Sequence, residues 1–153
     1  MMKKLKEVVL ILMLMFVFSY LLNFVWESFH AVYLYEDHKF SSELYVPMVH
    51  YVSTIDALIV SGIYITVSVL FRNLLWIKFM NKINIIAFLL FGLLSAIIVE
   101  YRAVYLVRKW NYNSIMPTIF GIGISPLVQL SITGILALLL TKRVLYPHKV
   151  LLS

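Results

Sequence analysis

The sequence predicts an all-α integral membrane protein, a single domain (residues 1–153) built as a four-helix transmembrane bundle. Of the 153 residues, 63% are hydrophobic and the mean hydropathy is +0.96, far above the values of soluble globular domains. The hydrophobic residues form four long segments, at about 8–26, 50–71, 83–104 and 116–140. Each segment is close to the roughly 20 residues that a helix needs to cross the hydrocarbon core, and a helix satisfies its own backbone polar groups there.

The bounds of these segments follow from prolines and polar residues. The first segment is expected to remain as a span, because it is longer than the apolar part of a signal peptide and no small-residue cleavage site follows it. Pro47 predicts a break before the second helix, at about His50. In the fourth segment, Pro117 is expected at the helix start and Pro126 as a later interruption of the hydrogen-bond ladder.

The short basic connection between the second and third segments is expected to lie in the membrane interface. Its portion 74–77 contains Trp76, and tryptophan is enriched at the level of the lipid headgroups. An amphipathic turn at this depth would place Trp76 among the headgroups.

Lysine and arginine residues predict the orientation of the chain. They gather before the first span, between the second and third spans and after the fourth span: Lys3, Lys4, Lys6, Arg72, Lys78, Lys82, Lys142, Arg143 and Lys149. In a four-span protein these three places share one side, and cytoplasmic loops are enriched in lysine and arginine. Both termini are therefore expected in the cytoplasm.

The net charge of +6 does not predict a nucleic-acid partner, because the basic residues lie at segment ends and not in a run with interleaved aromatics. The expected partners are membrane lipids, with a second copy of the chain or another membrane protein as alternatives. Cysteine is absent, which leaves no thiol nucleophile and no thiolate metal site.

Polar residues are expected to converge near the outer ends of the spans. Glu27 and His30 are spaced i, i+3, so both side chains leave the same face of a helix. With alternating span directions, the end of the first span meets the start of the second, the end of the third and the start of the fourth. The candidate pocket residues are Asn23, Trp26, Glu27, His30, His50, Asp56, Glu100, Arg102, Trp110 and Gln129.

Three interpretations of this cluster remain open. The carboxylates can pair with basic residues and hold the helix ends together. Glu27 and Glu100 can act as an acid/base pair or bind a substrate, and Arg102 would then favour an anionic group. A divalent metal is the third, with Glu27, His30, His50 and Asp56 as candidate ligands, although a lone Glu-x-x-His recurs by chance.

The fourth segment carries a small and polar face. Gly121, Ser125 and Gln129 recur at i, i+4 and i+8, which favours close packing against a neighbouring helix. Gln129 is an amide deep in the apolar layer and needs a partner. The expected partners are Asn23 or a backbone carbonyl freed by Pro126, so Gln129 is predicted to face the bundle interior.

Scattered residues of the chain resemble small four-span bacterial and archaeal membrane proteins of uncharacterised function. The pattern covers most of the chain: Asn23-x-x-Trp26-Glu27, Glu100-Tyr101, Trp110-x-Tyr112-x-x-x-Met116-Pro117 and Gly123-x-x-Pro126-Leu127-x-Gln129. The resemblance implies a four-span membrane fold in the inner membrane of a prokaryotic cell, and it carries no assigned activity.

Three functional hypotheses follow. The first is a membrane enzyme or binding protein with an ionisable pocket near the extracytoplasmic face, open to a lipid-like or anionic small molecule. The second is a non-catalytic subunit or assembly factor in which the polar cluster only pins the helices. The third is a small oligomeric pathway for an ion or solute.

Overall fold

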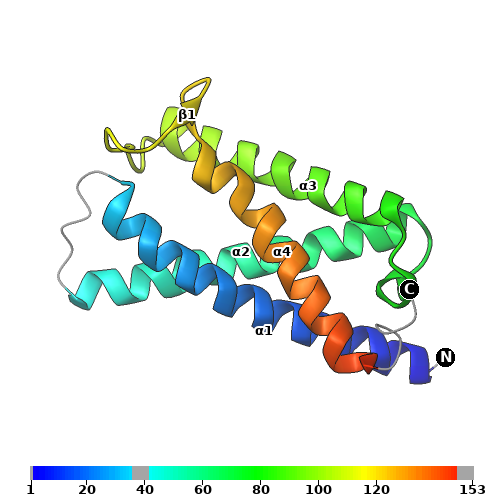
Figure 1. The fold of residues 1–153 in the computed structure, drawn as a ribbon. Coiled ribbons are helices and arrows are strands. Elements are labelled where there is room, and N and C mark those ends of the chain that lie inside the picture. The colour runs from blue at the N-terminus through cyan, green and yellow to red at the C-terminus, as the bar shows by residue number, and fades with distance from the viewer. Residues whose placement is uncertain (1, 36–41, 148–153) are drawn as a thin grey trace.

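The chain folds into four long helices that are apolar enough to cross a membrane (Figure 1). The structure is a computed structural model that describes residues 2–35 and 42–147. The helices are α1 (Met2–Tyr33), α2 (Ser42–Leu70), α3 (Lys82–Tyr101) and α4 (Ile124–Leu145). The predicted all-α fold of four candidate spans is confirmed, and the chain is an integral membrane protein by the length and composition of these helices.

The four helices run up and down around a common core. α1 packs against α2 and α4, and α3 packs against α4 and α2. The start of α1, the end of α4 and the connection from α2 to α3 lie at the same end of the bundle (Figure 1). The basic residues predicted to share one side therefore share one end, except Lys149, which lies outside the described residues.

The first two helices are longer than their hydropathy predicts. α1 continues beyond both ends of 8–26. Glu7 holds its first turns in place, because it lies 2.6 Å from Lys78 Nζ and accepts a hydrogen bond from the Tyr146 hydroxyl at 2.7 Å. α2 starts at Ser42 and not at His50, so the predicted break at Pro47 is wrong. Pro47 lies in the second turn, where its missing N–H removes a single hydrogen bond near the helix end.

The predicted start of the fourth helix is also wrong. The helix α4 begins at Ile124 and not near residue 116. Before it, the chain forms a hairpin of β1 (Thr118–Ile119) and β2 (Ile122–Gly123). Phe120 and Gly121 form its turn with φ of 50° and 76°, the positive values that a tight hairpin turn requires. Pro126 is the third residue of α4, where its missing N–H breaks no ladder.

The connection between α2 and α3 is part of the core. It contains the short 3₁₀ helix η1 (Trp76–Phe79), and Trp76 is only 1% exposed. Its ring lies between Tyr64 and Phe88, at centroid distances of 5.3 and 6.1 Å, and its indole N–H donates to Ser68 Oγ at 3.1 Å. The predicted interfacial position of Trp76 is therefore wrong, because Ser68 satisfies its N–H inside the bundle.

Candidate functional site

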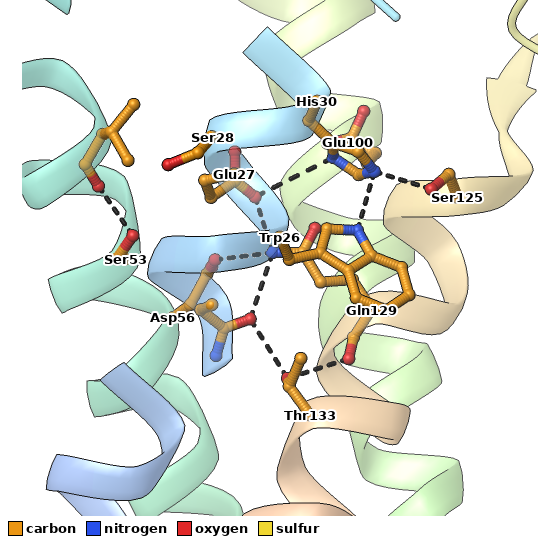
Figure 2. A network of polar contacts seen from close by, with 12 residues as sticks. Trp26, Glu27, Ser28, His30, Ser53, Asp56, Glu100, Ser125, Gln129 and Thr133 are labelled. Carbon is orange, nitrogen blue, oxygen red and sulfur yellow. Dashed lines mark hydrogen bonds and ion pairs between the residues drawn. The ribbon is translucent and has the colours of Figure 1, made fainter. Parts of the chain in front are cut away.

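A buried polar network joins three of the helices at Gln129 (Figure 2). The Gln129 Nε2 atom lies 3.1 Å from Asn23 Oδ1, 2.5 Å from Glu27 Oε1 and 3.0 Å from Asp56 Oδ2. These partners come from α1 and α2, whereas Gln129 belongs to α4. Gln129 is 3% exposed, so its predicted position inside the bundle, with Asn23 as a partner, is confirmed.

Asn23 is satisfied entirely within the protein. Its Nδ2 donates to the carbonyl oxygen of Ser19 at 2.9 Å and lies 3.1 Å from Ser19 Oγ. Its Oδ1 accepts from Gln129 and from the Thr133 hydroxyl at 3.0 Å. Because the amide has no remaining hydrogen-bonding capacity, Asn23 supports the site and does not contact a ligand.

The amide nitrogen of Gln129 cannot donate to all three oxygen atoms around it. An amide nitrogen has two hydrogens, and here three oxygen acceptors surround it. The Glu27 and Asp56 oxygens are at most 5.5 Å apart, since they lie within 2.5 and 3.0 Å of the same nitrogen. Carboxylates at such a distance repel one another. A proton or a cationic group shared between them would relieve the repulsion.

A third carboxyl group, that of Glu100, faces the same space from α3 and is 5% exposed. It accepts a hydrogen bond from the Tyr112 hydroxyl, and Trp110 Nε1 lies 3.5 Å from its Oε2. A π-helical turn, η2 (Arg102–Leu106), ends α3 and lets the following loop carry Trp110 and Tyr112 back over the bundle. Burial and the nearby Glu100 raise the pKa of Tyr112, so its hydroxyl stays protonated and donates.

The three carboxyl groups and the Gln129 amide line one cavity of about 410 Å³ inside the bundle, a size typical of small-molecule sites. Two exposed cations, Arg108 and Lys109, also line it. Lys109 Nζ lies 5.6 Å from the ring centre of Tyr51 and 5.8 Å from that of Trp110. The other lining residues that matter chemically are Glu27, Tyr35, Asp56, Glu100 and Gln129.

Asp56 lies far along its helix. The sequence predicts it about 9 Å beyond the start of its span, but α2 begins at Ser42, and Asp56 is therefore about 21 Å along the helix axis. It is 7% exposed. The long α2 places this carboxyl beside Gln129 and not at the end of its own helix.

His50 and Arg102 are two of the predicted members that do not line this cavity. His50 is exposed on the other side of α2, where Nδ1 is hydrogen-bonded to the Tyr20 hydroxyl and the ring lies 4.9 Å from that of Phe24. Arg102 is exposed and does not line the cavity. Residues two apart on a helix face different directions, so Arg102 points away from the side of α3 that carries Glu100.

The ion pairs predicted to pin the carboxylates are different from those in the structure. In residues 2–35 and 42–147, Lys78 pairs with Glu7, and His30 Nδ1 lies 3.9 Å from Glu27 Oε1. No arginine is paired with Glu27 or Asp56 in this part of the chain. The cavity carboxyl groups therefore have hydrogen-bonding partners but no arginine partner.

The four candidate metal ligands do not converge. His50 is separated from Glu27, His30 and Asp56, and no three histidine, aspartate or glutamate side chains of the described residues are grouped closely enough to hold a metal ion. The metal interpretation thus lacks a ligand set in this part of the chain.

His30 and Trp26 face away from the carboxyl cavity, toward a second cavity between α1 and α4. Trp26 Nε1 donates to His30 Nε2 at 2.7 Å, and Ser125 Oγ lies 2.6 Å from the same nitrogen (Figure 2). Trp26 therefore lines the second cavity, whereas Trp110 lines the first, so these two residues do not share the single pocket that the sequence predicts.

Sequence reasoning does not identify Ser125, Tyr112, Arg108 or Lys109 as site residues. Ser125 is recognised only as a small residue on one helix face, because its contact with His30 joins residues 95 positions apart. The other three lie in a loop whose path depends on the π-helical turn. The sequence contains Trp110-x-Tyr112 beside Arg108-Lys109, a signal for an interface loop but not for a pocket wall.

Comparisons of the chain with protein-family models, with curated proteins and with solved structures find no match. The resemblance to small four-span membrane proteins therefore stays a prediction, and the case for function depends on the geometry of the site.

Proposed function

We propose that this integral membrane protein binds a small zwitterionic molecule whose ammonium group enters the carboxyl cavity. The observation that supports this proposal is the meeting of Glu27, Asp56 and Glu100 around one space of about 410 Å³. An ammonium group donates hydrogen bonds to carboxylates and neutralises their repulsion. The rings of Tyr35, Tyr51 and Trp110 line the same cavity and add cation–π attraction.

The exposed cations at the cavity indicate the other half of the ligand. Arg108 and Lys109 line the cavity beside the carboxyl groups and suit a phosphate or carboxylate. A molecule with an ammonium group close to a phosphate therefore complements both sets of charges. This modifies the anionic ligand expected from the sequence, since Arg102, on which that expectation depended, does not line the cavity.

Titration calorimetry on the protein in lipid nanodiscs tests the proposal with phosphoethanolamine as the probe. Saturable binding is expected, with weaker binding of ethanolamine alone and of inorganic phosphate alone. Glu100→Gln should weaken phosphoethanolamine binding about 30-fold or more, because losing one partner of a buried charged pair costs about 2 kcal/mol or more. Lys109→Ala should weaken the binding of phosphoethanolamine but not of ethanolamine.

Glu43→Gln is the matched control, because Glu43 is an exposed carboxylate of α2 that does not line the cavity. It should bind phosphoethanolamine as the unaltered protein does. If neither phosphoethanolamine nor ethanolamine binds saturably at millimolar concentration, the proposed ligand class is wrong.

A second candidate function is that of a non-catalytic membrane subunit. The contacts of Gln129 with Asn23, Glu27 and Asp56 favour it, because they tie α1, α2 and α4 together without any ligand. In this case phosphoethanolamine should bind neither the unaltered protein nor the Glu100→Gln protein.

We further propose that both termini face the cytoplasm and that the protein lies in the inner membrane of a prokaryotic cell. The support for this orientation is that the basic residues gather at the end of the bundle where α1 begins and α4 ends. Reporter fusions after Lys6, at Lys78 and after Ser153 should report the cytoplasm, and a fusion near Lys39 the outside. An outside signal at Lys78 contradicts this orientation.

A further inference from the structure

The second cavity, of about 430 Å³, forms a groove between α1 and α4. Its lining is apolar along most of its length, with Leu22, Val25 and Leu136 among the residues. His30 and Ser125 also line it. This groove is separate from the carboxyl cavity, although Glu27, which lines that cavity, lies on the same helix as His30.

The hydrogen bonds around His30 define which ring nitrogen carries the proton. An indole N–H can only donate, so the Trp26 contact at 2.7 Å requires a lone pair on His30 Nε2. The proton of the neutral ring is then on Nδ1. Nδ1 is buried and has no hydrogen-bond partner in the described part of the chain, and it faces Glu27 Oε1 at 3.9 Å.

Ser125, His30 and Glu27 thus stand in the order of a nucleophile, a base and a carboxylate. Ser125 Oγ lies 2.6 Å from Nε2, so its hydroxyl competes with the Trp26 N–H for the single lone pair of that nitrogen. Nδ1 lies 3.9 Å from Glu27 Oε1, beyond hydrogen-bond distance. The tautomer and the order of the three groups match those by which a serine hydroxyl is activated in acyl transfer. We propose that Ser125 is the nucleophile and His30 the general base of a site that cleaves carboxylic esters of membrane lipids, with the acyl chain in the groove.

The depths of these residues suit such a substrate. His30 lies three residues before the end of α1 and Ser125 is the second residue of α4, so both are within about 5 Å of a helix end. Leu22 and Leu136 lie about 12 and 16 Å deeper along their helices. An ester bond joins the polar head of a lipid to its acyl chain, so an ester beside Ser125 places the chain along the apolar part of the groove.

The reaction proceeds in two balanced steps. In the first, a bond forms between Ser125 Oγ and the ester carbonyl carbon while His30 Nε2 takes the hydroxyl proton in place of the Trp26 N–H. The bond to the alcohol then breaks, and His30 returns the proton to the leaving oxygen. In the second, water attacks the acyl-serine by the same route and releases the carboxylic acid and free Ser125.

Two features assist these steps. Glu27 is a positioning residue, because it faces the ring nitrogen that does not contact the serine and favours the positive charge that forms on His30. Ser125 lies in the first turn of α4, where the positive end of the helix dipole favours negative charge on the substrate oxygen.

Labelling of the full-length protein in nanodiscs with a fluorophosphonate tests the inference. The probe reacts covalently with activated serines, and peptide mass spectrometry identifies the modified residue. Ser125 is expected to be labelled in the folded protein, Ser125→Ala to lose this label, and His30→Gln to react about 100-fold or more slowly because its base is missing. Ser131→Ala, a change in the same helix at a residue that lines neither cavity, should label normally.

A kinetic measurement keeps the role of Glu27 separate from a structural one. With p-nitrophenyl dodecanoate as substrate, Glu27→Gln should lower kcat about tenfold or more and leave KM nearly unchanged, because Glu27 does not line the groove. A purely structural role would change the amount of active protein without lowering kcat per labelled Ser125.

Absence of label on Ser125 in the folded protein overturns the inference, as does equal labelling of Ser125 in His30→Gln or in heat-unfolded protein. The inference and the proposed function can fail separately. If phosphoethanolamine binds and Ser125 is not labelled, the carboxyl cavity is the functional site. If Ser125 is labelled and phosphoethanolamine does not bind, the groove is the functional site.

Discussion

Replacing Gln129 with leucine is expected to lower the free energy of unfolding by about 3 kcal/mol or more. The change removes the amide nitrogen that lies within hydrogen-bond distance of Asn23, Glu27 and Asp56. Each buried polar group left without a partner costs about 1 to 3 kcal/mol, and leucine fills most of the amide's volume without replacing its hydrogen bonds. Reversible unfolding in mixed detergent micelles measures the change.

Thr66→Leu is the control for this experiment. Thr66 is an exposed residue of α2 whose hydroxyl donates to the carbonyl oxygen of Gly62 within the same helix, so leucine there removes a local bond and leaves no distant group unpaired. Its effect should stay within about 0.5 kcal/mol. A Gln129→Leu protein as stable as the Thr66→Leu protein would show that the network does not hold the helices together.

Replacing Glu27 with glutamine is expected to weaken phosphoethanolamine binding strongly while leaving the fold nearly as stable as before. Glutamine keeps an oxygen that accepts the hydrogen bond from Gln129, and it removes a negative charge close to Asp56. The relief of repulsion between neighbouring carboxylates offsets the weaker neutral hydrogen bond. The stability should therefore change by less than about 1 kcal/mol, whereas phosphoethanolamine binding should weaken about 30-fold or more.

Calorimetry and unfolding of the same preparation give both results. Glu27→Leu serves for comparison, because it removes the acceptor oxygen as well as the charge and should lose stability and binding together. The contrary result is a loss of more than about 2 kcal/mol of stability in Glu27→Gln, with no phosphoethanolamine binding to the unaltered protein or to Glu27→Gln. Glu27 is then a structural residue that holds the helices together, and the proposed function is wrong.

The amino-acid sequence by itself determined the number and nature of the helices. Apolar length identifies a span because the hydrocarbon core has a definite thickness, and the spacing of Glu27 and His30 puts both on one helix face. The prediction that Gln129 lies inside, with Asn23 as a partner, follows from the cost of an unpaired amide in hydrocarbon.

Tertiary structure decided where the helices begin and which polar residues meet. α2 extends through Pro47, where the Tyr45 hydroxyl donates to the carbonyl oxygen of Ser28 in α1. α4 starts only after a hairpin that lies within residues that hydropathy assigns to the span. His50 and Asp56 are six residues apart, about 120° around the helix, and only Asp56 faces the cavity.

The contact between Ser125 and His30 is the clearest case of what the fold adds. Helical periodicity defines which residues of one helix share a face, but the rotation of that helix against its neighbours depends on how all the facing side chains pack. The pairing of residues from α1 and α4 is therefore a property of the packed bundle, and no pattern within either helix predicts it.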